Sequence, residues 1–208
     1  MTHPDYEKYA AEVAASKAAT EAMQLATELG VQPPDYVNTD SPVEAQPVQP
    51  RMIHRTGNLL DFAEAGMFDV VVQGCNCFNA MGGGIAYEIL SRYPEVAEVD
   101  RETRYADYNK LGNWTSWPVP CKSGDAHFTV INAYTQYEMS NGKDVFEYAA
   151  FELILKKLAY KYPKKRIGFP YIGMGLAQGN KHRIMMMLHD FARTIYTSGG
   201  SVTLVRFG

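Results

Sequence analysis

The stretch FDVVVQGCNCFNAMGGGIAYEIL, residues 68–90, decides the fold. It begins with FDVVVQG, a continuous apolar run between turn signals, which predicts a buried strand. It ends in a helical pattern, GGIAYEIL, which must stop before Pro94. The loop between them, GCNCFNAMGGG, combines cysteines, asparagines and consecutive glycines. That composition leaves three interpretations open: a metal clip, a nucleophile loop or a backbone cradle for phosphate.

The same alternation of strands and helices continues along the chain from Arg51 onward. Besides residues 68–74, strands are predicted at residues 52–56, 114–120, 127–134, 166–173 and 201–207. Helices are predicted at residues 58–66, 83–93 and 94–109, and two later apolar stripes have helical spacing. These stripes contain Phe151, Ile154, Leu155, Leu158 and Ala159, and then Ile184, Met187, Leu188, Phe191, Ala192 and Ile195. The pattern predicts an α/β sandwich with a largely parallel or mixed central sheet.

Residues 1–50 differ in composition from the rest of the chain. Residues 5–29 are rich in Ala, Glu and Lys between Pro4 and Gly30, which predicts a helical extension over residues 1–30. Residues 31–50 are rich in proline and predict an extended linker. The first 50 residues carry 2 basic and 8 acidic side chains, against 18 and 15 in the rest of the chain. We therefore expect one domain over residues 51–208, preceded by an acidic arm that could self-associate through residues 1–30.

The composition of the chain excludes several classes of protein. Its 208 residues are 46% hydrophobic and 12% aromatic, which is ample for a packed core. The N-terminus lacks the features of a secretory signal, and no apolar run reaches the roughly 20 residues of a membrane helix. Three cysteines do not make a disulfide framework, so we expect a reducing, cytoplasmic compartment. The net charge of −3 gives no strongly basic face, so neither nucleic acid nor membrane is an expected partner, and the basic run at residues 161–166 fits a solvated helix end.

A second glycine-rich loop has an equivalent position in the sequence. PYIGMGLAQG, residues 170–179, follows an apolar strand and precedes a helix that begins near Lys181. Glycine lets the backbone approach a ligand without interference from a Cβ atom, and N–H groups at a helix start favour anions. Two such loops at the carboxyl ends of strands could clasp a diphosphate from both sides. Neither loop has the G-x-x-x-x-G-K-[ST] or G-x-G-x-x-G pattern of other phosphate-binding motifs.

Together, QGCNCFNAMGGGIA and FPYIGMGLAQGN resemble the two ligand loops of the macro domain, a family with an ADP-ribose-binding α/β fold. The sequence is most similar to a branch of bacterial, phage and fungal proteins described as ADP-ribose 1″-phosphate phosphatases. The resemblance covers about residues 52–208, including GNLLDFAEAGMFDVVV and VINAYTQY. It implies a three-layer α/β/α fold with a mixed, largely parallel sheet, and ADP-ribose or a derivative as small-molecule partner. No cofactor and no metal are implied, and a phage origin would place the protein in the host cytoplasm.

The resemblance also implies ligand-binding roles for particular residues. Asn58 and Leu59 match the position that contacts adenine, where the Asn58 carbonyl could accept from the adenine amino group. Asn76 matches the asparagine beside the distal ribose, and Tyr134 would line the same end. The other residues match the two diphosphate loops: Gly82, Gly83, Gly84 and Ile85 in the first, and Ile172, Gly173, Met174, Gly175 and Leu176 in the second.

The match is weaker for residues that would carry out chemistry. Ala86 and Asn180 stand where related hydrolases often have Asp, and an amide cannot act as a general base. His182 is the nearest titratable substitute, and Cys77 near a helix N-terminus could have a lowered pKa and act as a nucleophile. Asn76 would orient the ribose for the reaction. Three functions stay open: a 1″-phosphate hydrolase, a non-catalytic reader or sequesterer of ADP-ribose or a related nucleotide, and an interaction protein acting through the N-terminal arm.

Several of these residues also have a purely structural interpretation. Asn76 could brace its loop through hydrogen bonds to the backbone, and Asn180 has the position of a helix N-cap. Cys77 fits a small buried residue, and the spacing of His and Cys does not indicate zinc. Asp144 and Glu147 have the spacing of a capping box for the helix that follows them.

Overall fold

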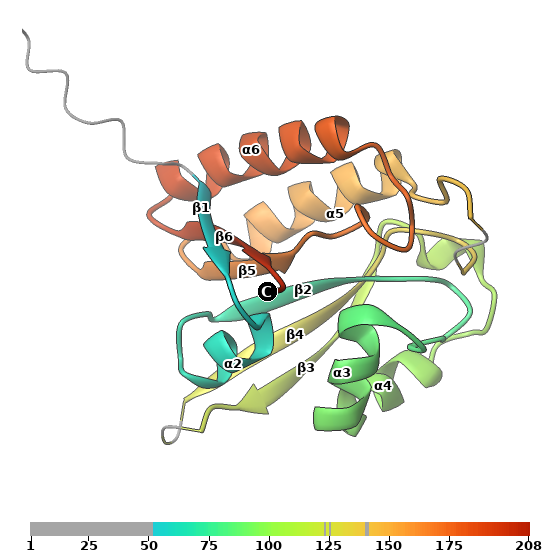
Figure 1. Ribbon diagram of the computed structural model, residues 1–208, viewed down its shortest axis with the longest axis horizontal. Coiled ribbons are helices and arrows are strands. Elements are labelled where there is room, and N and C mark those ends of the chain that lie inside the picture. Colours follow the sequence, from blue (N-terminus) through green and yellow to red (C-terminus); the bar gives the residue numbers. More distant parts are fainter. Residues whose placement is uncertain (1–51, 123, 125, 140–141) are drawn as a thin grey trace, which may run out of the picture. The chain divides into compact units, whose positions relative to one another are not determined.

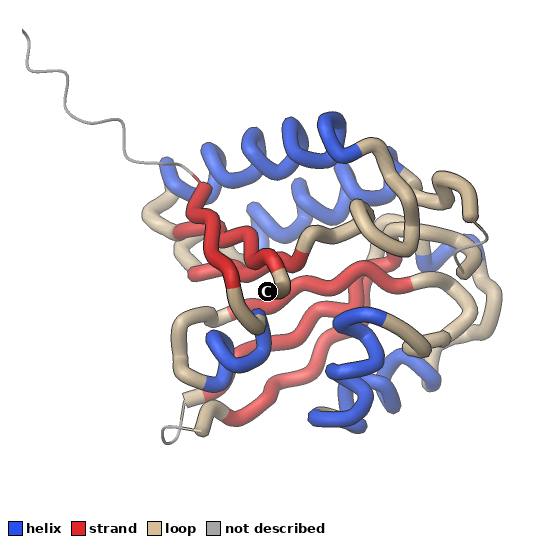
Figure 2. The backbone as a smooth tube through the Cα atoms, viewed as in Figure 1, coloured by secondary structure: helices blue, strands red, loops and turns tan. Residues whose placement is uncertain are grey.

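A mixed six-stranded sheet forms the centre of the fold (Figures 1 and 2). The structure is a computed structural model that describes residues 52–122, 124, 126–139 and 142–208. The helical extension, the linker and the self-association predicted for residues 1–50 lie outside the described residues. Within the described residues, no helix has the length and apolar character needed to cross a bilayer.

The strands lie in the order β1-β6-β5-β2-β4-β3, and all neighbours are parallel except the antiparallel pair β3 and β4. Their bounds are Met52–Thr56 for β1, Val70–Cys75 for β2, Trp114–Pro120 for β3, His127–Tyr134 for β4, Arg166–Pro170 for β5 and Ser201–Arg206 for β6. The predicted strands are confirmed, although the one predicted over residues 166–173 ends at Pro170. Val70, Val71 and Val72 of β2 are buried, as their apolar run predicts for a strand covered on both faces.

Helices cover both faces of the sheet and make it the middle of three layers (Figure 1). On one face lie α5 (Tyr148–Lys161) and α6 (Lys181–Thr197), whose apolar stripes join the larger core cluster. On the other face lie α2 (Leu59–Glu64), α3 (Gly84–Arg92) and α4 (Pro94–Arg101), which share a second cluster. The predicted three-layer α/β/α fold with a mixed, largely parallel sheet is therefore confirmed.

The helix predicted over residues 94–109 is wrong in its length. α4 ends earlier, and the chain continues through turns into a short 3-10 helix, η1 (Tyr108–Lys110). The Asn79 amide donates to the carbonyl groups of Asp100 and Thr103 at 2.9 and 3.1 Å. Because a side chain from another segment takes the carbonyl groups at the helix end, the helix stops there and the chain turns back towards the interior.

The capping box predicted from Asp144 and Glu147 is wrong. The Glu147 N–H donates to the Thr135 carbonyl at 2.8 Å, so the backbone stays extended up to Glu147 and α5 begins only at Tyr148. Glu147 has the N-cap position, but its side chain makes no capping hydrogen bond. The Asp144 carboxylate instead accepts from the Phe146 N–H and the Tyr148 hydroxyl at 3.0 and 2.5 Å. Asp144 therefore fixes the approach to the helix and not its first turn.

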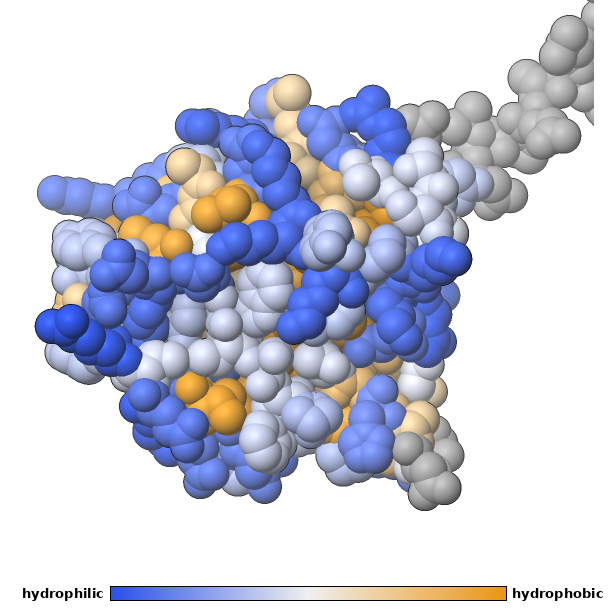
Figure 3. Space-filling model, turned by 180° about the vertical axis from the view of Figure 1, so that it is seen from behind, coloured by the Kyte–Doolittle hydropathy of each residue, from blue (hydrophilic) through white to orange (hydrophobic). Residues whose placement is uncertain are grey.

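Hydrophilic residues dominate the face shown in Figure 3, and hydrophobic residues gather on it only in small separate patches. The basic run at residues 161–166 follows the end of α5, and its lysines are exposed. Arg166, which ends this run, pairs with Asp69 at 2.9 Å. The prediction of a solvated helix end is confirmed.

Candidate functional site

A cavity of about 960 Å³ opens where β1, β2, β5 and β6 reach their carboxyl ends. Parallel strands bring these ends to one edge of the sheet, so loops that are distant in sequence meet there. Among the described residues that line the cavity, Glu88 is the only charged one. The lining consists of Gly57, Asn58, Leu59, Gly74, Asn76, Ala80, Gly82, Gly83, Gly84, Ile85, Ala86, Glu88, Gln136, Met139, Pro170, Tyr171, Ile172, Gly173, Gly175, Leu176, Ala177, Val205 and Phe207.

The first glycine loop forms part of this lining and leads into α3. Gly83 is the N-cap residue of α3 and provides no side-chain cap, so the first N–H groups of the helix lack that acceptor. A Cβ atom at Gly82 would have no heavy atom within 4 Å, and one at Gly83 would meet only the Leu176 Cδ1, at 3.1 Å. The missing side chains therefore leave the backbone open to the cavity. A helix start without a side-chain cap favours the binding of an anion.

The second glycine loop lies opposite the first, because Leu176 belongs to it and is the nearest neighbour of Gly83. A Cβ atom at Gly175 would have no heavy atom within 4 Å. Gly173 differs, since it has a φ of +72° and a Cβ atom there would lie 2.4 Å from the Phe146 ring. Gly173 therefore serves turn geometry and packing, whereas Gly175 leaves room for a ligand.

The two loops differ in how the helix that follows each of them is capped. The Asn180 side chain caps α6 by accepting from the Arg183 N–H at 3.0 Å, which confirms its predicted N-cap role. The start of α6 thus has a side-chain cap from within the chain, which the start of α3 lacks. Asn180 and His182 are exposed, and the structure does not bring either of them to the cavity lining.

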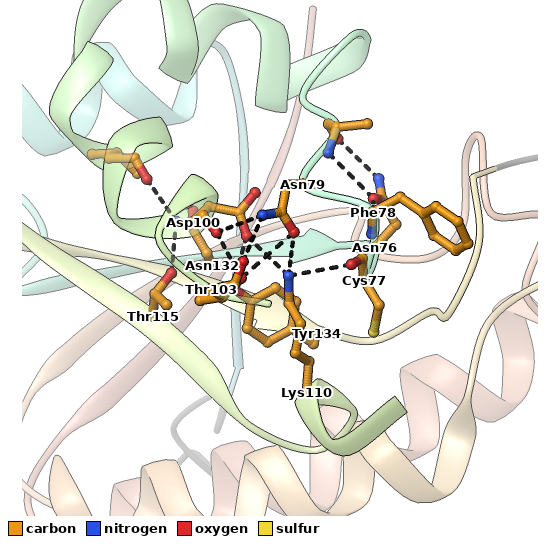
Figure 4. Close-up of polar contacts among 12 residues, drawn as sticks. Asn76, Cys77, Phe78, Asn79, Asp100, Thr103, Lys110, Thr115, Asn132 and Tyr134 are labelled. Carbon is orange, nitrogen blue, oxygen red and sulfur yellow. Dashed lines mark hydrogen bonds and ion pairs between the residues drawn. The ribbon is translucent and has the colours of Figure 1, made fainter. Parts of the chain in front are cut away.

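Asn76 braces its loop and also lines the cavity (Figure 4). Its Oδ1 accepts from the N–H groups of Phe78 and Ala80 at 2.9 and 3.3 Å, and its amide donates to the Ala80 carbonyl at 2.9 Å. Gln136 contributes a second amide side chain to the lining. The bracing role of Asn76 is confirmed, and its contact with a ligand stays a prediction.

Cys77 is not placed to act as a nucleophile. Its side chain is fully buried, and burial raises the pKa of its thiol to about 11. The predicted lowering of this pKa by a helix N-terminus is wrong, because α3 begins only at Gly84 and burial dominates. Cys75 and Cys121 are also free and buried. Among the described residues, no group of three or more His, Cys, Asp and Glu side chains could hold a metal ion.

A buried polar network beside the first glycine loop was not foreseen from the sequence (Figure 4). Lys110 is 7% exposed and donates to the Cys77 carbonyl at 3.3 Å and to the Asn79 side chain. Its Nζ lies 3.7 Å from the Asp100 carboxylate, which is 1% exposed and accepts from the Tyr134 hydroxyl at 2.7 Å. The network joins α4, η1 and β4 to the loop. Sequence reasoning missed Lys110 and Asp100 because a charged residue in a turn or at a helix end is usually solvated.

Tyr134 and Met174 were predicted to bind the ligand, but neither lines the cavity. Tyr134 is 2% exposed, and burial raises the pKa of its hydroxyl with a further contribution from Asp100. It therefore belongs to the buried network and not to the end of the cavity. Met174 is buried in the larger core cluster. Gly173 and Gly175, on either side of Met174, line the cavity, and so does Gln136, which follows β4 two residues after Tyr134.

The Asn58 side chain is engaged at both of its polar atoms. Its carbonyl accepts from the N–H groups of Leu60 and Asp61 at 2.8 and 3.2 Å and thereby caps α2. Its amide donates to Glu88 Oε1 at 2.7 Å. Both lone pairs of the Asn58 carbonyl oxygen are therefore already used, which leaves none for the predicted hydrogen bond from a base. Sequence reasoning missed Glu88, although helical spacing puts it one turn after Gly84, on the same side of the helix.

Solved structures of macrodomains share the fold of this chain. The macrodomain of Thermus aquaticus DarG matches with a TM-score of 0.55 and 15% identity, over 76% of this chain and 97% of that one. A macrodomain of Trypanosoma brucei, solved in complex with ADP-ribose, matches with a TM-score of 0.53 and 13% identity, over 76% of this chain and 63% of that one. The fold is therefore the macrodomain fold.

A relative in sequence comes from a bacteriophage. The uncharacterized 17.5 kDa protein in the tk-vs intergenic region of Enterobacteria phage T4 is 31% identical over 115 residues, which cover 53% of this chain and 71% of the phage protein. No protein-family model matches the chain. The chain belongs to the same family as this phage protein.

Proposed function

We propose that the protein binds ADP-ribose or a closely related nucleoside diphosphate derivative in this cavity. One observation carries the proposal: two glycine-rich segments of backbone face each other across the cavity, with the Leu176 Cδ1 only 3.1 Å from where a Gly83 Cβ would lie. The macrodomain fold supports the choice of ligand, since the Trypanosoma brucei macrodomain was solved in complex with ADP-ribose. A cavity of about 960 Å³ is large enough for a ligand of this size.

In this proposal the diphosphate lies between the two loops and is held by peptide N–H groups. The uncapped start of α3 supplies N–H groups from Gly84 and Ile85, and Gly175 and Leu176 supply others from the opposite side. The lining residues that the structure describes include no Lys, Arg or His, so the backbone would provide the positive ends of dipoles that the anion needs. Asn76, held by its own loop, would orient the distal ribose.

The geometry favours binding without turnover over removal of a 1″-phosphate. Hydrolysis requires a general base or a nucleophile within reach of the reacting group. Asn76 and Gln136 line the cavity but are amides, while His182, Asn180 and Cys77 lie outside its lining. The Glu88 carboxylate does line the cavity, but it is hydrogen-bonded to Asn58, at the end where the base and not the 1″-phosphate is expected. We therefore propose a reader or sequesterer of ADP-ribose, and hydrolysis of ADP-ribose 1″-phosphate is the alternative to be tested.

Calorimetric titration of the 208-residue chain with ADP-ribose tests the proposal. We expect saturable heat with one site per chain and a rise in unfolding temperature with ligand concentration. No heat and no thermal shift at millimolar ligand would exclude both nucleotide functions. Phosphate release from ADP-ribose 1″-phosphate then distinguishes a reader from a hydrolase. We expect no release above the uncatalysed rate, and release that His182→Ala abolishes would instead support the hydrolase.

A further inference from the structure

Of the described residues in the cavity lining, Glu88 alone carries a charge, and only one of its two carboxylate oxygens has a partner within this part of the chain. It lies in α3, one turn after the glycine loop, and its side chain is 28% exposed. Its Oε1 accepts from Asn58 Nδ2 at 2.7 Å and pairs with Arg92 Nη2 at 2.7 Å. Within the described residues its other oxygen, Oε2, accepts no hydrogen bond. Two donors therefore fix the carboxylate and leave one oxygen available to the cavity.

The residues around Glu88 favour the base of a bound nucleotide over its diphosphate. A carboxylate repels phosphate, so the diphosphate is expected to keep its distance and lie along the glycine loops. Val205 and Phe207 line the cavity as well, and Phe207 is 75% exposed. Val205 and Phe207 lie beside the segment that contains Asn58, because the Gly57 N–H donates to the Arg206 carbonyl at 2.9 Å. An exposed aromatic side chain and a free carboxylate oxygen at one end of a cavity are suited to a base that carries a hydrogen-bond donor.

We propose that Glu88 determines base specificity by accepting, through Oε2, a hydrogen bond from an exocyclic amino group of the bound base. This assignment rests on the proposed function and gives Glu88 the acceptor role that the sequence suggested for Asn58. Adenine presents an amino donor at its six-position, whereas hypoxanthine presents a carbonyl oxygen there. A carboxylate attracts the first group and repels the second. The cavity thus selects adenine nucleotides by a charge-assisted hydrogen bond to Glu88 Oε2. The Asn58 amide holds the carboxylate in place by donating to its other oxygen, Oε1.

The test compares ADP-ribose with its hypoxanthine analogue, inosine diphosphate ribose, on the 208-residue chain. Calorimetric titration of the wild type should give an affinity for ADP-ribose about 10- to 100-fold higher than for the analogue, as for a hydrogen bond to a charged group. Glu88→Gln keeps the size of the side chain and can still accept from Asn58. Its side chain has both an acceptor and a donor, so it can hydrogen-bond to the amino group of adenine or to the carbonyl oxygen of hypoxanthine. We expect this variant to bring the two affinities within about threefold of each other, mainly by weakening ADP-ribose.

Controls separate base recognition from a loss of structure. Glu98→Gln removes an exposed carboxylate from α4, outside the cavity lining, and should leave the ratio of the two affinities unchanged. The unfolding temperature of each variant reports the effect of losing the Glu88–Arg92 pair, which is expected to be small because Arg92 also pairs with Asp61 at 2.7 Å.

Two results would overturn the assignment, and they are distinguishable. If the wild type binds ADP-ribose and the hypoxanthine analogue equally, or if Glu88→Gln weakens both ligands by the same factor, Glu88 does not read the amino group while the proposed function stands. If the wild type binds neither ligand, the proposed function fails and the role of Glu88 fails with it. A wild-type preference that Glu88→Gln abolishes and Glu98→Gln retains supports the assignment.

Discussion

At the scale of single residues, the same amino acid serves two purposes in the glycine loops. Gly83 and Gly175 border open space or a flexible leucine, whereas Gly173 and Gly179 have no room for a side chain because Phe146 and Ile184 pack against them. The sequence could not separate these cases, since both kinds lie in glycine-rich loops after a strand. Only the packing of distant residues shows which glycines leave room for a ligand.

The substitution Gly83→Val should abolish ligand binding and leave the fold intact. Gly83 has φ −157° and ψ 163°, an extended conformation that valine adopts readily, and only the exposed Leu176 side chain lies near the new Cβ. The branched side chain would block the approach of the diphosphate to the backbone. We expect ADP-ribose affinity to fall at least about 100-fold by calorimetry, which corresponds to about 2.8 kcal/mol, with an unchanged unfolding temperature.

A double variant tests the reason for this loss. If Gly83→Val acted by pushing Leu176 into the site, adding Leu176→Ala would restore binding. Continued loss of binding in the double variant is the result expected for a blocked backbone. Full affinity in the single variant would mean that the diphosphate lies elsewhere in the cavity.

Cys77 should be unreactive in the folded protein and should make stability depend on pH in the alkaline range. Burial raises its pKa from 9.0 to about 11, so below pH 9 the thiol is protonated in both folded and unfolded chains. Between these values the unfolded thiol ionises first, and the free energy of unfolding falls as pH rises. Urea denaturation at a series of pH values should show this decline, and Cys77→Ala should make it shallower. Rapid alkylation of Cys77 at neutral pH in the folded protein would contradict the assignment.

At the scale of helices and strands, Asn180, a candidate catalytic residue in the sequence, serves as the N-cap of α6. Its side chain caps α6 at 3.0 Å from the Arg183 N–H. Asn180→Ala should therefore lower the free energy of unfolding by about 1 kcal/mol, whereas Asn180→Asp should retain it. Neither variant should change ADP-ribose affinity, because Asn180 lies outside the cavity lining. Urea denaturation and calorimetry measure the two effects separately, and a loss of affinity without a loss of stability would reverse this conclusion.

The buried network acts on the same scale, because it fixes the first glycine loop against α4, η1 and β4. Lys110→Met would leave the Asp100 carboxylate buried with the Tyr134 hydroxyl as its remaining donor. We expect the free energy of unfolding to fall by about 3 to 5 kcal/mol in urea denaturation. Adding Asp100→Asn removes the unpaired charge and should recover part of this loss. If both variants were equally unstable, the ion pair would not be what stabilises the loop.

At the scale of the whole molecule, periodicity predicted most of the fold and failed where distant side chains intervene. The apolar runs of β2 and the stripes of α5 and α6 depend on local pattern, and they were predicted correctly. The end of α4 depends on Asn79, and the start of α5 depends on a hydrogen bond to Thr135. Neither helix boundary can therefore be predicted from the residues next to it in the sequence. The cavity was predicted through its glycines. Glu88 was missed because its role requires that Asn58 be already engaged.

The N-terminal arm gives a prediction that concerns the whole chain. Residues 1–50 carry 8 of the 23 acidic side chains and lie outside the described residues. If the arm mediates self-association, deletion of residues 1–50 should lower the mass measured in solution by light scattering and leave ADP-ribose affinity unchanged. An unchanged mass would rule out the arm as a self-association element.

No cationic side chain occurs among the described residues of the cavity lining, which has a consequence for how salt affects the binding of an anion. Peptide dipoles act over short distances, whereas lysine and arginine attract polyanions from afar and lose that attraction as counterions accumulate. If an anionic ligand binds there through peptide N–H groups, its affinity should depend little on ionic strength, which titrations at a series of salt concentrations would measure.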